Sequence, residues 1–141
     1  MATLVTPTKL QKLEFPVPPL EGAEGPGRVT IITGMVQIWL VAYSSGPEVN
    51  EKESFKLLLD PLLTPGQFRK ATSITSLSNM VYEAGATPNQ TEWAIDDAQA
   101  TFDDEAGQVQ LVVDVRVRAS GNATSAYTSW LMFQVTTLAR V

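Results

Sequence analysis

Five branched aliphatic side chains occupy every second position in the stretch that begins at Gln108. They are Val109, Leu111, Val113, Val115 and Val117. Successive side chains of an extended strand point to opposite sides of a sheet, so this alternation places all five on one face. The stretch predicts a strand with one buried face, and no other stretch of the chain constrains the fold as strongly. A packed face determines how a protein folds rather than what it does.

The region from Glu92 to Val141 predicts three long strands joined in a meander. Two segments rich in turn-forming residues, 103–107 and 120–124, predict the two turns. Before the first turn, Trp93 and Ile95 share one parity while Phe102 has the other. A bulge at Asp96–Asp97 would reconcile them, because one extra residue shifts the register by one place.

A second strand is predicted from residues 28 to 44. In its second half, from Met35 to Tyr43, apolar side chains occupy both parities. Strands with two apolar faces are typical of positions covered on both sides, so we expect a central strand. A shorter strand is predicted around Phe55, ending at Asp60–Pro61.

One helix is predicted to start near Pro65. Thr64 is a suitable N-cap, with Pro at the first helical position and Gln67 at the third. Apolar residues then follow at spacings of three and four up to Ala84, and Gly85 stands where a C-terminal cap belongs. The stretch 72–76 consists of Thr, Ser and Ile, which have poor helix propensity and oppose this prediction.

Together these elements predict an α+β fold, in which an antiparallel sheet of four to six long strands packs against one helix. A β-barrel or half-barrel is the alternative, since the strands are long enough to curl. Residues 1–27 are rich in Pro and Gly but also carry apolar side chains, and they predict an extended arm. Residues 28–141 are predicted to form a single domain.

Composition excludes several kinds of chemistry. The chain contains no Cys and no His, so it offers neither thiol nucleophiles, nor His-based triads, nor the usual ligands of zinc and iron–sulfur clusters. The formal net charge is −5 and the basic residues are scattered, which disfavours nucleic acid and anionic membranes as partners. No secretory signal is recognisable, and we expect a cytoplasmic protein that needs no cofactor.

An acidic cluster is the first candidate site, and a hard cation would be its ligand. The candidate metal ligands are Asp96, Asp97, Asp103, Asp104 and Glu105. Their spacing differs from that of an EF-hand loop. The simpler interpretation is a solvated turn and strand edge, where Asp is favoured and charge discourages edge pairing.

The polar side of the valine strand is the second candidate. Asp114, Arg116 and Arg118 share that side and, beside Trp130, could line a pocket in which an Arg grips a carboxylate or phosphate. An ordinary solvent-exposed strand face is the simpler interpretation. Trp130 lies among polar residues of its own strand, and it is the aromatic that we would assign to an interface.

Three functions remain in view. The first is a non-catalytic structural or interaction protein that associates with itself, which fits the low charge content and the missing catalytic side chains. The second is a small-molecule binding module with a pocket between sheet and helix. The third is an enzyme that uses carboxylates alone or a divalent cation around residues 96–105. The sequence favours the first, and it leans against catalysis.

Overall fold

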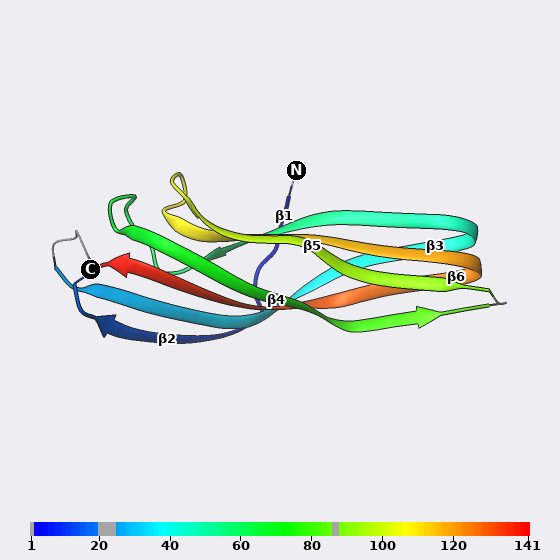
Figure 1. Ribbon diagram of the computed structural model, residues 1–141, viewed down its shortest axis with the longest axis horizontal. Helices are drawn as coiled ribbons and strands as arrows, with labels where there is room; N and C mark the ends of the chain where they lie inside the picture. Colours follow the sequence, from blue (N-terminus) through cyan, green and yellow to red (C-terminus); the bar gives the residue numbers. More distant parts are fainter. Residues whose placement is uncertain (1, 20–24, 86–87) are drawn as a thin grey trace.

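The structure, a computed structural model, describes residues 2–19, 25–85 and 88–141. The described chain contains six strands and no helix (Figure 1). The strands are β1 (Thr3–Leu4), β2 (Lys9–Val17), β3 (Gly27–Leu59), β4 (Phe68–Glu83), β5 (Gln90–Asp103) and β6 (Gln108–Arg140). The predicted α+β fold is therefore wrong. One mixed six-stranded sheet instead folds over into two layers, with no helix in the described chain to pack against it.

Strands β3 and β6 form the frame of the molecule. They pair antiparallel along their whole length, from Gly27 opposite Arg140 to Leu59 opposite Val109. Both strands bend where the register shifts, around residues 44–49 of β3. In Figure 1 this bend lies at the end of the molecule opposite the C-terminus, and both strands double back there. One long two-stranded ribbon thus contributes two adjacent strands to each layer.

The bend depends on backbone conformations that few residues adopt. Gly46 has φ 142° and Gly121 has φ 110°, both in a region that glycine reaches at little cost. A Cβ on Gly121 would also lie 2.8 Å from the carbonyl oxygen of Pro88. The predicted turn at residues 120–124 is therefore wrong in its consequence. β6 doubles back there without a break, and its two halves pair with β3 rather than with each other, so no hairpin forms.

Each half of the ribbon carries its own outer strands. In the first layer β2 pairs with β3 and β4 pairs with β6, giving the order β2–β3–β6–β4. In the second layer β1 pairs with β3 and β5 with β6, giving β1–β3–β6–β5. The register of β5 shifts between Ile95 and Asp97, which confirms the predicted bulge. The turn predicted at 103–107 is also confirmed, because it joins β5 to β6.

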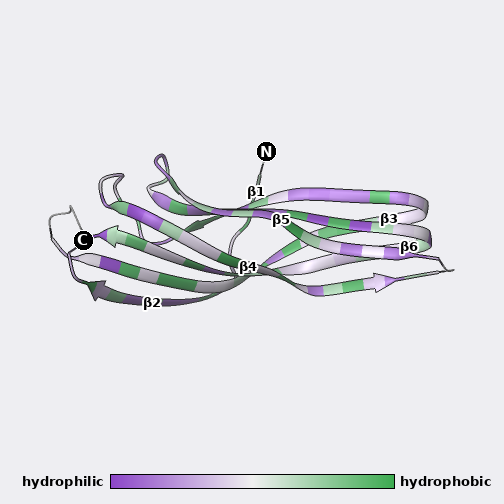
Figure 2. Ribbon diagram, in the orientation of Figure 1, coloured by the Kyte–Doolittle hydropathy of each residue, from purple (hydrophilic) through white to green (hydrophobic). Residues whose placement is uncertain are grey.

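The core lies between the two layers. The five alternating residues predicted to share a buried face are at most 1% exposed. Alternation of hydrophobic and hydrophilic residues is visible as bands along the long strands in Figure 2. Val36, Leu131 and Val135 of the other layer belong to the same core cluster, as do the cross-strand neighbours Phe55 and Leu57. The burial of these side chains is the main source of stability for a chain of this length.

Aromatic contacts join the layers along the β4–β5 side. The rings of Phe68 and Phe102 stack with centroids 5.1 Å apart. Farther along, Tyr82 lies against Trp93 at 6.4 Å, and the Trp93 indole donates a hydrogen bond of 3.0 Å to the carbonyl oxygen of Tyr127. These contacts tie the two outermost strands together although no ladder between them is observed in the described residues.

The N-terminal segment joins the layers on the opposite side. β1 pairs with the second layer, and the Val5 amide donates to the Lys56 carbonyl at 2.9 Å. The Thr8 amide then donates to the Met35 carbonyl at 3.0 Å, where β2 begins on the first layer. The described part of the predicted arm thus pairs along β3, while its residues 20–24 lie outside the described residues. No helix in the described chain is long and apolar enough to span a membrane.

The segment predicted as a helix forms β4 instead. Its start signals do act locally, because the Thr64 amide donates to Gln67 Oε1 at 2.9 Å and the Gln67 amide donates to the Thr64 carbonyl at 3.0 Å. This capping geometry forms a single turn, and no helix follows it among the described residues. The following Thr- and Ser-rich residues have stronger β than helix propensity, and pairing with β6 satisfies their backbone groups.

Candidate functional site

The two layers expose opposite outer faces with different chemistry. We call the outer side of β2–β3–β6–β4 the neutral face and that of β1–β3–β6–β5 the charged face. Outward positions follow from the register and from the alternation of buried and exposed residues. The neutral face carries apolar side chains that remain exposed or half-exposed. They are Leu13, Phe15, Ile31, Met35, Trp39, Val41, Tyr43, Ile74, Tyr127, Trp130 and Met132.

Formal charges occur only at the rim of the neutral face, as far as the structure describes it. The charged residues at outward positions are Lys9, Lys70, Glu83 and Arg140. The remaining outward positions between them hold Thr, Ser and Gln, such as Thr33, Ser76 and Gln134. A water-facing antiparallel strand normally alternates apolar residues with polar and charged ones. The centre of this face departs from that pattern.

An aromatic ridge stands at the end of the neutral face near the bend. Trp39 is 58% exposed and Tyr43 is 62% exposed, with Val41 between them on the same side of β3. The ring of Trp39 lies 4.8 Å from that of Tyr127 on the neighbouring strand. The sequence predicted that this stretch of β3 is covered on both sides. Within the chain that prediction is wrong, because only the inner side is covered.

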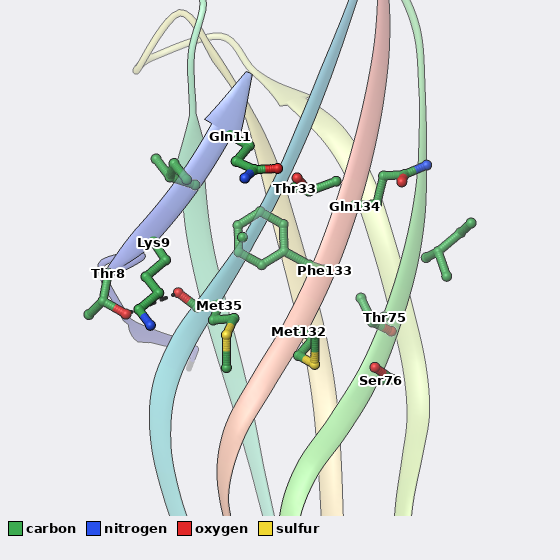
Figure 3. Close-up of a pocket in the computed structure, with 13 residues that line it drawn as sticks. Thr8, Lys9, Gln11, Thr33, Met35, Thr75, Ser76, Met132, Phe133 and Gln134 are labelled. Carbon is green, nitrogen blue, oxygen red and sulfur yellow. Dashed lines mark hydrogen bonds between the residues drawn. The ribbon is translucent and has the colours of Figure 1, made fainter. Parts of the chain in front are cut away.

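A groove of about 720 Å³ crosses the neutral face farther along β3. All of its lining residues come from the first layer or from Thr8, just before β2. Figure 3 shows Lys9 and Gln11 on one side, Met35 and Met132 toward the middle, and Ser76 on the other side. The groove therefore spans four adjacent strands and is lined by apolar, hydroxyl and amide groups.

Glycine is required at the level of this groove. Gly34 lies opposite Leu10 on β2 and Phe133 on β6. A Cβ at Gly34 would lie 2.6 Å from the Lys9 carbonyl oxygen, 2.7 Å from a methyl group of Leu10 and 2.9 Å from the Phe133 ring. The missing side chain thus lets β2 and Phe133 pack closely beneath the groove.

The charged face is built around two arginines of β6. Arg116 contacts Glu92 at 2.5 Å and Asp96 at 3.1 Å, and Arg118 contacts Glu92 at 2.5 Å and Glu48 at 3.4 Å. The hydrogen bonds that the Arg116 guanidinium donates to Asp96, followed by those that it donates to Glu92, raise its pKa. Hydrogen bonding from Arg116 lowers the pKa of the Asp96 carboxyl. Both arginines are therefore engaged in ion pairs on their own surface.

The four predicted ligand-binding residues are divided between the two faces, three on the charged face and one on the neutral face. Asp114 accepts a hydrogen bond from the Ser54 hydroxyl, and it lies on the charged face with Arg116 and Arg118. Trp130 lies between Gln37 and Ser78 on the neutral face. The bend in β6 separates the two groups, because it places the first half of β6 in one layer and the second half in the other. The predicted helix that would have closed a pocket above them is absent from the described chain.

The acidic residues are also distributed rather than gathered. Asp96 binds Arg116, and Asp97 accepts a hydrogen bond from the Gln99 amide at 3.1 Å. Asp103 accepts hydrogen bonds from the backbone amides of Ala106 and Glu105 in the turn, and the Ala106 amide above all lowers the pKa of that carboxyl. Asp104 and Glu105 lie exposed in the same turn. Among the described residues no three acidic side chains converge to hold a cation.

The groove was not predicted as a site, although the sequence contained one signal for this face. From Met35 to Tyr43 the outward parity of β3 carries Met, Gln, Trp, Val and Tyr, where a solvated strand would carry charges. The four groove strands come from distant parts of the sequence, so their meeting could not be read from any single stretch. No protein-family model, curated protein or solved structure matches this chain, and its function is inferred from its own surfaces.

Proposed function

We propose that this protein is a non-catalytic structural or interaction protein that acts as a homo-oligomer, with the neutral face as its contact surface. One observation carries the proposal: a broad sheet face exposes aromatic and apolar side chains, and among its described residues formal charges occur only at the rim. Monomeric soluble proteins seldom expose apolar patches larger than a few hundred Å².

The residue types of the neutral face match those of protein–protein interfaces. Interface centres are enriched in Trp, Tyr, Phe and Met and depleted of Lys, Glu and Asp, with polar residues at the rim. Trp39, Tyr43, Trp130 and Met132 lie within the face, whereas Lys70 and Glu83 lie at its edge. The sequence interpretation of Trp130 as an interface residue is consistent with this arrangement.

The charged face shows what an ordinary solvated surface of this chain looks like. Lys56 lies 3.5 Å from Asp103, and Arg116 and Arg118 pair with acidic neighbours. Such groups are well hydrated, and burying them would require desolvation of every charge. A contact surface on the neutral face avoids this cost, which favours that face over the opposite one.

The two other functions have less support. The expected ligand pocket required a helix above the sheet, and the described residues contain no helix. The arginines expected to bind the ligand instead bind carboxylates of the same chain. An enzyme based on the acidic cluster would need free carboxylates close together, whereas Asp96 is paired with Arg116, Asp103 accepts turn amides, and no group of three potential metal ligands occurs among the described residues. The neutral face therefore provides the stronger basis for a function.

The proposal is tested by the solution mass, measured by light scattering over a range of micromolar concentrations, for the wild type and for Met132→Lys. Met132 is 42% exposed at the centre of the neutral face, so a lysine there adds a charge without entering the core. We expect an oligomeric wild type and a variant shifted toward monomer, since an unpaired charge in an interface is expensive.

Val112→Lys is the matched control. Val112 occupies an outward position on the same strand β6, but on the charged face between Lys56 and Gln99. We expect this variant to keep the wild-type mass. A wild type that stays monomeric throughout, or a mass lowered equally by both substitutions, would contradict the proposal. Circular dichroism shows whether each variant keeps its sheet structure.

A further inference from the structure

We infer that the partner on the neutral face is a second copy of this chain, bound across a two-fold axis so that the aromatic ridge of each copy enters the groove of the other. This inference rests on the proposed function and specifies its geometry. The ridge comprises Trp39, Val41, Tyr43 and Tyr127, and the groove is centred where Gly34 lies opposite Phe133. Both features lie on the neutral face. The ridge projects from it and the groove is a hollow in it, so the ridge of one copy can fill the groove of another.

The size of the face fits one partner of this kind. From Val29 to Tyr43, β3 extends roughly 50 Å at about 3.3 Å per residue, and three to four strands span roughly 15–19 Å. The product is on the order of 800 Å², which is close to the roughly 800 Å² that each partner buries in a standard stable interface. A second copy would thus cover the face about as fully as a stable dimer requires.

The charge distribution also favours a second copy. A nucleic acid or an anionic membrane surface needs clustered cations, whereas the centre of the neutral face carries none among the described residues: Lys9 lies on the β2 edge, and Lys70 and Arg140 lie at the end of the face near the C-terminus. A neutral face meets an identical neutral face without juxtaposing like charges. The strand β3 is apolar on both sides, and the copy supplies the outer cover that the chain itself lacks.

Two-fold symmetry follows from the order of ridge and groove along the strands. In a two-fold interface, if residue i of one copy contacts residue j of the other, j also contacts i. The axis then passes midway between ridge and groove. That level is occupied by three cross-strand neighbours, Gln37 on β3, Trp130 on β6 and Ser78 on β4. Each of these residues would lie near its own counterpart.

This geometry is tested by thiol cross-linking, which the cysteine-free chain makes unambiguous. Face-packed sheets lie about 10 Å apart, too far for a disulfide, whose Cα atoms are usually about 4.4–6.8 Å apart. The probe is therefore a bismaleimide with a spacer of about 10 Å. Gln37→Cys is exposed and near the proposed axis, and we expect it to cross-link to itself as a covalent dimer at low micromolar concentration.

Asn50→Cys is the matched control, because it is equally exposed and lies on the same strand but on the charged face opposite Arg118. We expect it to remain monomeric on a denaturing gel. Ser78→Cys on β4 provides a second site near the axis if the first variant folds poorly. Light scattering on the same samples gives the mass without cross-linking.

The outcomes separate this inference from the proposed function. A dimeric mass with cross-linking at residue 37 or 78, and none at residue 50, supports the two-fold arrangement. A dimeric mass without cross-linking at 37 and 78 overturns the arrangement and leaves self-association standing. A mass that grows beyond the dimer with concentration indicates a head-to-tail contact and also overturns it. A monomeric mass removes both the arrangement and the proposed function.

Discussion

The neutral and charged faces are both built around β3 and β6, yet their outward side chains differ in charge and in hydration. On the charged face, Arg116 and Arg118 pair with carboxylates from β5 and β3, which hydrates the surface and fixes neighbouring strands to one another. On the neutral face, Trp39 and Tyr43 project outward with no charged residue beside them on the same parity of β3. The bend in the ribbon allows this contrast, because it assigns each half of a strand to a separate surface.

The contrast teaches that exposure alone does not define a contact surface. Both faces are solvent-accessible, and both consist of regular antiparallel pairing along the ribbon. They differ in how strongly water binds their side chains, and this sets how much free energy is lost when a face is covered. Covering the neutral face removes apolar area from water, whereas covering the charged face would strip water from ion pairs.

The largest expected effect tests whether the faces share one core. Leu131 lies beneath the neutral face and Leu111 beneath the charged face, and both are fully buried. We expect Leu131→Ala and Leu111→Ala each to lower the free energy of unfolding by about 2–5 kcal/mol, through lost burial and the cavity left behind. Denaturant unfolding at a fixed protein concentration measures this. Two separate transitions in either variant would show that the layers unfold independently.

A smaller effect is expected from a change in the packing beneath the neutral face. Gly34→Ala would place a Cβ within 3 Å of backbone and ring atoms, so we expect a loss of about 1–3 kcal/mol from overpacking. The matched control is Gly66→Ala in an exposed turn, where the nearest atom would be 4.0 Å away. Thermal unfolding compares the two. Equal melting temperatures would mean that β2 and Phe133 move aside without loss.

The smallest effect is the acid sensitivity of the charged face. Hydrogen bonding from Arg116 lowers the pKa of folded Asp96 below its unfolded value of about 3.9, so this contribution to stability is complete above that pH. It is lost as the pH falls through the folded pKa. Unfolding curves between neutral pH and pH 2 should therefore show a shallower acid decline for Asp96→Asn than for the wild type.

Asn50→Ala is the control for this comparison, since it alters the charged face without removing a carboxylate. It should keep the wild-type decline. An Asp96→Asn variant with an unchanged decline would show that the pair with Arg116 is too well screened by solvent to affect folding. In that case the charged face contributes hydration and little else.

Part of the fold was predictable because it depends on local patterns. The alternation from Val109 to Val117 identified a buried face directly, and the parity change after Ile95 located a real bulge. The helix prediction failed at a definite point. The capping signals of Thr64 and Gln67 form their turn, but they specify only where a helix could start and not whether pairing with β6 will capture the residues that follow.

The candidate site was less predictable because its parts are remote in sequence. The signals at 120–124 marked an unusual backbone correctly, with Gly121 and Ala123 at positive φ. Whether such a segment forms a hairpin or bends a continuous strand depends on the partner strand. Here Gly121 pairs with Gly46, far earlier in the chain. The expectation that Trp130 joins Arg116 and Arg118 failed for the same reason, because the bend places them on opposite faces.

The sequence by itself determined the strand that begins at Gln108, its buried parity and the bulge near Asp96, because alternation and turn chemistry act over a few neighbouring residues. It also determined the excluded chemistries, since absent Cys and His cannot be supplied by folding. Only the tertiary structure decided that one ribbon folds over into two layers and that β2, β3, β6 and β4 form one neutral surface. Those outcomes depend on pairing between residues remote in sequence, whose free energy no local pattern contains.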